Sequence, residues 1–258
     1  MIKENLLYIF IYFVSFGYFY SQKVTITPIV KVTYNATLNL GENYRHSEKF
    51  ILIGNTVESY FAAYQNYLND SGQYILNEDV IDVRAISAYF QERVIKRNNN
   101  YTVFFNNEDG KIKYDDNIGL KWVLYGETKI ISDVVCQMAA TNKFGRRWIA
   151  YFAKDSYQIP IGPYKFGGLP GLIFELYDTK DDYHFTLTGI AKEKTAFVFN
   201  LDGYKNYTKQ QYLKAKDNLE YSPSRFPDMG AEMNIKNRIM LERIKKMHNN
   251  PIELKPVE

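Results

Sequence analysis

Apolar and polar residues alternate along most of the chain, which is the pattern of strands that bury one face. The alternation predicts a strand over 23–34, with Pro28 at a bulge or an edge, and two strands over 49–64 about the Gly54-Asn55 turn. A hairpin is predicted over 101–115 around a turn at 106–110. Three consecutive strands are then expected over 120–132, 134–144 and 146–155, the last two joined by a corner at Phe144-Gly145-Arg146.

A second hairpin is predicted over 172–190, and its register can be derived from the pattern. Directly opposed residues must share a face of the sheet, and only a four-residue loop at 179–182 places apolar residues opposite apolar residues. The expected pairs are Leu176 with Phe185, Phe174 with Leu187, Glu175 with Thr186, and Tyr177 with His184. One face of this hairpin is therefore apolar and the other mixed.

Residues 66–97 follow no single period. Their last part, 82–97, has apolar residues at helical spacing, which favours a helix and leaves an extended conformation open. The apolar residues concerned are Ile86, Tyr89, Phe90 and Val94.

Helical patterns appear towards the C-terminus, over about 204–248. Thr208 and Gln211 have the spacing of a capping box at the start of the first helix, and 222–229 interrupt the pattern. The second helix carries an apolar stripe, which we expect to pack on the sheet. The stripe consists of Met233, Met240, Ile244 and Met247.

The composition and the alternating pattern support a mainly β (α+β) fold, with an antiparallel sheet and helices in the C-terminal part. The 258 residues include 23 tyrosines and 17 phenylalanines, which suit half-buried pleated surfaces. We expect a single domain over 22–258. The net charge of +3 is spread along the chain rather than gathered into a basic patch, so nucleic-acid binding is not indicated.

Residues 1–21 are predicted to be a signal peptide. A short charged start containing Lys3 precedes an apolar stretch of the length of a secretory signal, with cleavage after Ser21 or after Gly17. An uncleaved N-terminal anchor is the alternative. We therefore expect an exported protein that, after cleavage, is not integral to a membrane.

Few residues carry recognisable chemistry, and no cofactor or metal is expected. Cys136 is the only cysteine and is flanked by apolar residues, so we interpret it as a buried inert thiol rather than a redox nucleophile. The histidines, His46, His184 and His248, lack metal-binding spacing. His184 lies beside Glu175 on one predicted face, which permits acid–base chemistry. A solvated polar face is the favoured interpretation.

Two further clusters have both a functional and a structural interpretation. Asp178, Asp181 and Asp182 could bind calcium, but charged residues are also typical of hairpin tips, which we favour. Arg146 and Arg147 precede Trp148 and could hold an acidic ligand. We favour a turn with solvated arginines.

The stretch 159–178, IPIGPYKFGGLPGLIFELYD, is rich in glycine and proline and leads into a strand rather than a helix. It therefore matches neither a dinucleotide fingerprint nor a P-loop. We interpret it as a rigid corner whose conformation is set by its prolines and glycines, namely Pro160, Pro163, Pro170, Gly167, Gly168 and Gly171. Tyr164, Phe166 and Leu169 are expected to pack this corner over the open side of the sheet.

This stretch resembles the defining motif of the GLPGLI family, exported proteins of Bacteroidota. The motif is formed by Gly168, Leu169, Pro170, Gly171, Leu172 and Ile173, and the similarity extends over 121–190 and to NNPIEL at 249–254. Cys136 and Gly145-Arg146 match typical family positions, whereas Asp133 stands where glycine is expected. The resemblance implies a curved antiparallel sheet or half-barrel in a periplasmic, outer-membrane-associated or secreted protein, and it supplies no catalytic residues.

We therefore expect a non-enzymatic envelope protein that binds a hydrophobic or peptide ligand, or an outer-membrane partner. Candidate binding residues are Tyr164, Phe166, Leu169, Arg146 and Trp148. Two alternatives stay open: a hydrolase or redox enzyme that uses His184 with Glu175 or Cys136, and a structural surface component.

Overall fold

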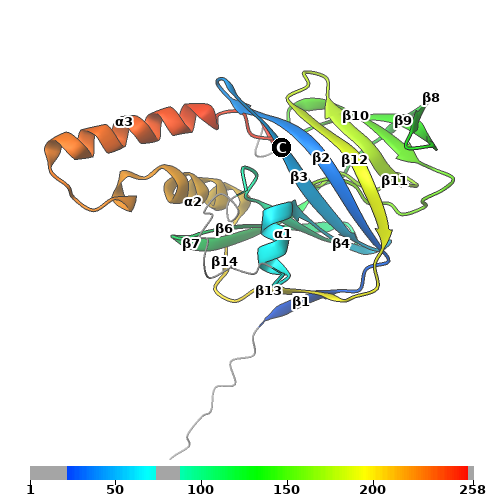
Figure 1. The fold of residues 1–258 in the computed structure, drawn as a ribbon, viewed down its shortest axis with the longest axis horizontal. Helices are drawn as coiled ribbons and strands as arrows, with labels where there is room; N and C mark the ends of the chain where they lie inside the picture. The colour runs from blue at the N-terminus through cyan, green and yellow to red at the C-terminus, as the bar shows by residue number, and fades with distance from the viewer. Residues whose placement is uncertain (1–21, 74–87, 255–258) are drawn as a thin grey trace, which may run out of the picture.

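The computed structural model describes residues 22–73 and 88–254. Within these stretches, twelve strands form one open sheet, antiparallel except where β14 joins β7 (Figure 1). Across the sheet the order is β14 (Lys205–Asn206), β7 (Gly110–Asn117), β6 (Asn100–Asn107), β5 (Arg93–Arg97), β4 (Glu58–Ala63), β3 (Tyr44–Gly54), β2 (Val30–Gly41), β12 (Tyr183–Lys192), β11 (Leu172–Asp178), β10 (Arg146–Ala153), β9 (Val134–Lys143) and β8 (Val123–Ile131). The expected mainly β fold is confirmed. The predicted signal peptide lies outside the described residues.

The N-terminal strand prediction is wrong in one respect, because 23–34 is not continuous. β1 (Lys23–Ile26) pairs with β13 (Phe197–Asn200) in a separate two-stranded sheet, and the chain then turns at Pro28 before β2 begins. Proline has no backbone N–H to contribute to a ladder, so it suits this break between two sheets.

The helix predicted over 82–97 is wrong at its end. Residues 93–97 form β5, which pairs with β4 and β6 on either side. Here, hydrogen bonding to a neighbouring strand on each side outweighs the helical preference that the spacing of apolar residues indicated. Residues 74–87 lie outside the described part. A short helix, α1 (Tyr64–Asp70), follows β4 where a strand residue was expected at Tyr64.

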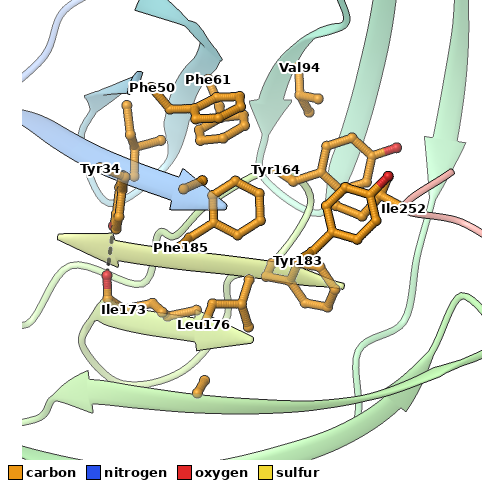
Figure 2. Close-up of a cluster of buried hydrophobic side chains, with 14 of the residues drawn as sticks. Tyr34, Phe50, Phe61, Val94, Tyr164, Ile173, Leu176, Tyr183, Phe185 and Ile252 are labelled. Carbon is orange, nitrogen blue, oxygen red and sulfur yellow. Dashed lines mark hydrogen bonds between the residues drawn. The ribbon is translucent and has the colours of Figure 1, made fainter. Parts of the chain in front are cut away.

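The main core lies on one face of the sheet, and Figure 2 shows part of it. Phe50, Phe61 and Phe185 pack their rings together there. The Tyr34 hydroxyl donates to the Ile173 carbonyl at 2.6 Å, which satisfies a polar group in the middle of the core. A second core on the other face of β3 to β6 is covered by β1, β13 and α1.

Both predicted hairpins are present. In the second, Glu175 pairs with Thr186, Leu176 with Phe185 and Tyr177 with His184, which confirms the derived register over these three pairs; the expected pair of Phe174 with Leu187 is not part of this ladder. In the first, Asn107 pairs with Gly110, so the turn is shorter than predicted. The strands β8, β9 and β10 are consecutive neighbours, as expected.

The C-terminal helices are α2 (Lys209–Tyr221), a 3-10 turn at Pro223–Arg225, and α3 (Ala231–Met247). Thr208 and Gln211 form the predicted capping box. α2 lies over β7, whereas α3 extends away from the sheet (Figure 1). No helix in the described stretches is long and apolar enough to cross a membrane.

The expectation that the apolar stripe of α3 packs on the sheet is wrong for most of the helix. Met233 and Met240 are exposed, and so are Ile235 and Ile239 outside the stripe, at 54% and 60%. Ile244 and Met247 are half-buried, at the end of the helix that contacts β2. Leu241 is the residue of α3 classed as buried. An apolar stripe indicates a face that favours contact, but the sequence does not say where the helix lies.

Candidate functional site

The corner at 159–171 closes over the open side of the sheet, as expected. Tyr164, Phe166 and Leu169 are all buried in the main core. Gly168 has a φ of +80°, and a Cβ on Gly171 would collide with the Ala153 carbonyl oxygen. Both glycines are therefore needed for the shape of the corner. This packing agrees with the interpretation of the motif as a rigid corner that packs over the sheet.

A charged residue in this corner is completely buried. The side chain of Lys165 is 0% exposed, and its ammonium donates to the Tyr114 hydroxyl at 2.7 Å, to Asp116 at 2.7 Å and to Glu253 at 2.6 Å. Lys209, on the first turn of α2, contacts the same two carboxylates at 3.0 and 2.8 Å. Burial would raise the pKa of Asp116, but the two ammonium groups outweigh it and lower that pKa.

A second buried pair lies nearby. Glu92, just before β5, accepts from the Tyr212 hydroxyl at 3.1 Å and from Lys216 at 2.9 Å. Burial would raise the pKa of Glu92, but Lys216, Lys165 and the Tyr212 hydroxyl together lower it by more. The Tyr164 hydroxyl donates to Glu253 at 2.7 Å and lies 3.5 Å from Glu92, so it connects the two groups of charges.

Of these charged residues, Glu92, Lys216 and Glu253 line a cavity of about 280 Å³, and Lys165, Asp116 and Lys209 lie behind its wall. Its wall comes from the segment before β5, from β7, from the 159–171 corner, from α2 and from residues 248–254. Six of the eighteen lining residues are tyrosine or phenylalanine, namely Tyr89, Phe90, Tyr114, Tyr164, Tyr183 and Tyr221. An aromatic cavity with a few charged groups is the usual form of a small-ligand site, so this is the candidate functional site.

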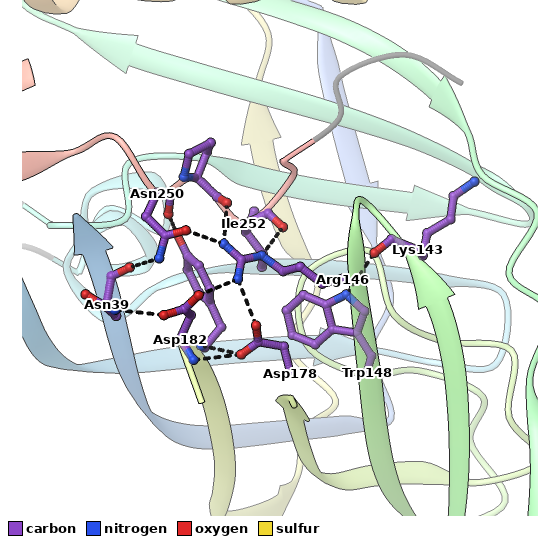
Figure 3. Close-up of polar contacts among 10 residues, drawn as sticks. Asn39, Lys143, Arg146, Trp148, Asp178, Asp182, Asn250 and Ile252 are labelled. Carbon is purple, nitrogen blue, oxygen red and sulfur yellow. Dashed lines mark hydrogen bonds and ion pairs between the residues drawn. The ribbon is translucent and has the colours of Figure 1, made fainter. Parts of the chain in front are cut away.

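The wall formed by residues 250–253 is fixed by Arg146, and Figure 3 shows this arrangement. The guanidinium donates to Asp178 and Asp182 at 2.8 Å each. It also donates to Asn250 Oδ1 at 2.6 Å, and to the carbonyl oxygens of Pro251 and Ile252 at 3.0 and 3.2 Å. All five guanidinium donors are thereby used.

The expectation of solvated arginines is therefore wrong for Arg146, whose side chain is 1% exposed, and holds for the exposed Arg147. The arginine holds a segment of this chain rather than an external ligand. Trp148 is also buried, with its Nε1 donating to the Lys143 carbonyl at 3.1 Å. Of the five candidate binding residues, Tyr164 lines the cavity. The other four are buried and do not line it.

The three hairpin aspartates are engaged by other residues of the chain, and Asp178 and Asp182 share Arg146. Asp178 accepts from the backbone N–H groups of Asp182 and Tyr183 in addition to Arg146. Asp181 pairs with Arg45 at 2.6 Å on the surface. Among the described residues, no group of three or more possible ligands has the arrangement of a metal site.

His184 and Glu175 form the predicted pair, with His184 Nε2 3.0 Å from Glu175 Oε1. The other ring nitrogen lies 3.1 Å from Asp181, and Lys129 also contacts Glu175 at 2.6 Å. The hydrogen bond with Glu175 raises the pKa of His184 more than burial lowers it. Both ring nitrogens are engaged, so the neutral imidazole needed by a general base is disfavoured.

Cys136 is fully buried, as expected. Burial raises the pKa of its thiol to about 11, and Glu175 acts in the same direction. A thiol with such a pKa carries very little thiolate at neutral pH, which does not suit a nucleophile.

The residues that sequence reasoning missed are Glu92, Lys165, Lys209, Lys216 and Glu253. They come from four separate parts of the chain, with Lys209 and Lys216 both on α2, and meet only in the fold. One local signal was present at Lys165, a lone charge between two aromatic residues in a corner otherwise formed by apolar residues, glycine and proline. Charged residues are almost never fully buried unless paired, so the corner implied partners elsewhere.

Comparison with known proteins relates the chain only to solved structures. It matches no family model and no curated protein. Structures of PNGF-II in the P21 and C2 space groups are similar, each with a TM-score of 0.52 and 15% identity. Each alignment covers 72% of this chain and 32% of the PNGF-II chain, so the matched region is about a third of that protein. The likeness supports the fold alone.

Proposed function

We propose that the protein is an exported, non-enzymatic binding protein whose cavity receives a hydrophobic ligand or an apolar part of a peptide. The observation that carries the proposal is the aromatic cavity of about 280 Å³ enclosed by α2, the corner and residues 248–254. Its base is a fully hydrogen-bonded network of buried charges, which favours a fixed shape over collapse. Preformed cavities of this kind bind ligands with little reorganisation.

The assignment to the GLPGLI family and to the cell envelope stays a prediction from the sequence motif and the N-terminal apolar segment. It is compatible with the structure, because the motif forms the corner that supplies Tyr164 and Lys165 to the site. Periplasmic, outer-membrane-associated and secreted locations are all included in this proposal.

Native mass spectrometry of the protein purified from its own envelope tests the proposal. We expect a mass above that of the polypeptide, which falls to the polypeptide mass on denaturation. Leu213→Trp should abolish the added mass, because Leu213 is a half-exposed residue that lines the cavity. Ile239→Trp on α3, outside the cavity lining, is the matched control and should retain it. A bare polypeptide in both the parent protein and the control contradicts the proposal.

Docking of an outer-membrane partner is a second candidate, and it rests on a different surface. β8 ends the sheet, so one side of its backbone has no neighbouring strand among the described residues. Val123, Leu124 and Ile130 on this strand are exposed. Edge strands of this kind accept an added strand from a partner. Leu124→Glu should weaken co-purification of such a partner and leave the cavity ligand bound.

A further inference from the structure

One carboxylate in the cavity wall forms no ion pair with any described residue, although Lys216 and Arg225 act on it at longer range. Glu220 lies one helical turn after Lys216 on α2 and lines the same cavity. Within the described part of the chain, its carboxylate has no hydrogen-bond or ion-pair partner; only its backbone carbonyl accepts, from Arg225. Burial raises the pKa of Glu220, and the nearby Glu92 adds to that effect against the opposing Lys216. The cost of this burial is uncompensated in the structure.

The other charges of the wall are matched. Lys216 donates to Glu92 at 2.9 Å, and Glu253 and Asp116 are shared by Lys165 and Lys209. The neighbouring Asp217 is paired with Lys245 at 2.6 Å. The cavity therefore has a net surplus of one negative charge, located at Glu220.

Other groups in the wall offer acceptors that lack donors. The Gln91 Oε1 atom is buried, and no described residue donates to it. His248 Nδ1 lies 3.1 Å from the Ile244 carbonyl, a contact that requires its proton. Burial lowers the pKa of His248, so the ring is neutral and its Nε2 is an acceptor. Glu220, Gln91 and His248 all line the cavity, so a carboxylate, an amide and an imidazole lie among its aromatic residues.

We propose that the cavity selects a monocationic ligand, an amine with an apolar or aromatic body, whose ammonium pairs with Glu220 and donates to Gln91. This inference rests on the proposed binding function and specifies its ligand class. The ammonium supplies both the missing charge and the missing donors. The surrounding tyrosine rings favour a cation through their negative faces. An anionic ligand would instead add to the surplus charge.

Isothermal titration with three matched probes tests the inference: phenethylamine, 2-phenylethanol and 3-phenylpropionate. We expect phenethylamine to bind about tenfold more tightly than 2-phenylethanol, as a charge-assisted hydrogen bond implies, and 3-phenylpropionate to bind most weakly. Glu220→Gln should reduce the preference for the amine to about twofold or less. Asp217→Asn is the control, because that carboxylate is already paired, and it should keep the preference.

The outcomes separate the two proposals. Equal binding of the amine and the alcohol overturns the cation inference and leaves the binding function intact. A preference that survives Glu220→Gln, or that Asp217→Asn removes equally, also overturns it. Binding of none of the probes contradicts both proposals. Glu220 is partly exposed and has no side-chain partner, so its variant should fold, which thermal unfolding can verify.

Discussion

At the scale of single residues, the structure depends on charges that are buried and completely paired. Arg146 and Lys165 are at most 1% exposed, yet every donor of both side chains has an acceptor. A buried ion pair need not stabilise relative to apolar residues, but removal of one partner leaves an uncompensated charge. The two residues consequently fix where the 250–253 segment lies.

Replacement of Arg146 should therefore be strongly destabilising. Arg146→Gln leaves Asp178 buried without its counter-ion and frees Asn250, so we expect a loss of about 3–5 kcal/mol in the free energy of unfolding. Urea denaturation measures it. Arg147→Gln, at the exposed neighbouring position, should change stability by no more than about 0.5 kcal/mol. Equal effects of the two substitutions would show that Arg146 does not form its contacts with Asp178, Asp182 and residues 250–252.

The His184–Glu175 pair predicts a pH dependence with a defined sign. Its hydrogen bond raises the pKa of His184, so the stabilisation is complete below the unfolded value of about 6.5 and is lost as pH rises through the folded value. The difference in melting temperature between the parent protein and His184→Gln should be largest near pH 5.5 and shrink towards pH 9.

Glu175→Gln serves as the second arm of that experiment. The folded pKa of Glu175 is lowered, because the hydrogen bonds from His184 and Lys129 outweigh the effect of burial. The stabilising contribution of Glu175 is therefore retained at pH 5.5. The difference in melting temperature between the parent protein and Glu175→Gln should also become smaller as pH rises. A difference that is constant between pH 5.5 and pH 9 would refute the ionic pairing.

At the scale of elements, the corner at 159–171 is a rigid connection between β10 and β11. Its hydrogen bonds link it to distant parts of the sheet: Lys96 donates to the Pro160 carbonyl at 3.1 Å, and Trp122 to the Gly167 carbonyl at 2.9 Å. It thereby supplies Tyr164 and Lys165 to the cavity in fixed positions.

The two glycines of the corner should respond differently to alanine. In Gly168→Ala the added Cβ meets open space, so the only penalty is the positive φ. We expect a loss of about 1 kcal/mol in the free energy of unfolding. Gly171→Ala forces a Cβ against the Ala153 backbone, and we expect a larger loss, about 1–3 kcal/mol and a widened cavity. Thermal unfolding ranks the two variants; a greater effect at Gly168 would contradict the packing described.

The elements also show where sequence patterns suffice. The hairpin register was predictable because strand side chains alternate with a period of two, so a one-residue slip would place Glu175 opposite Phe185. The capping box at Thr208 was predictable from local spacing. By contrast, β5 and the exposed α3 depend on which neighbours cover them, and that information is not local.

At the scale of the whole molecule, the site is assembled from segments far apart in sequence. Glu92 and Lys216 are 124 residues apart, and Lys165 and Glu253 are 88. Taken singly, each of these residues suggests a solvated surface, because only the fold supplies the opposite charge that permits burial. The aromatic excess indicated half-buried sheet surfaces, but the cavity itself could not be located from the sequence.

Titration with N-phenyl-1-naphthylamine, a neutral apolar dye whose fluorescence rises on leaving water, tests the central claim of a ligand-binding cavity most directly. We expect saturable, one-to-one binding of the dye to the parent protein and to Ile239→Trp. Dye binding to Leu213→Trp should be weaker by about tenfold or more, because the added ring occupies the cavity. Absence of saturable binding, or equal binding by both tryptophan variants, would contradict the claim.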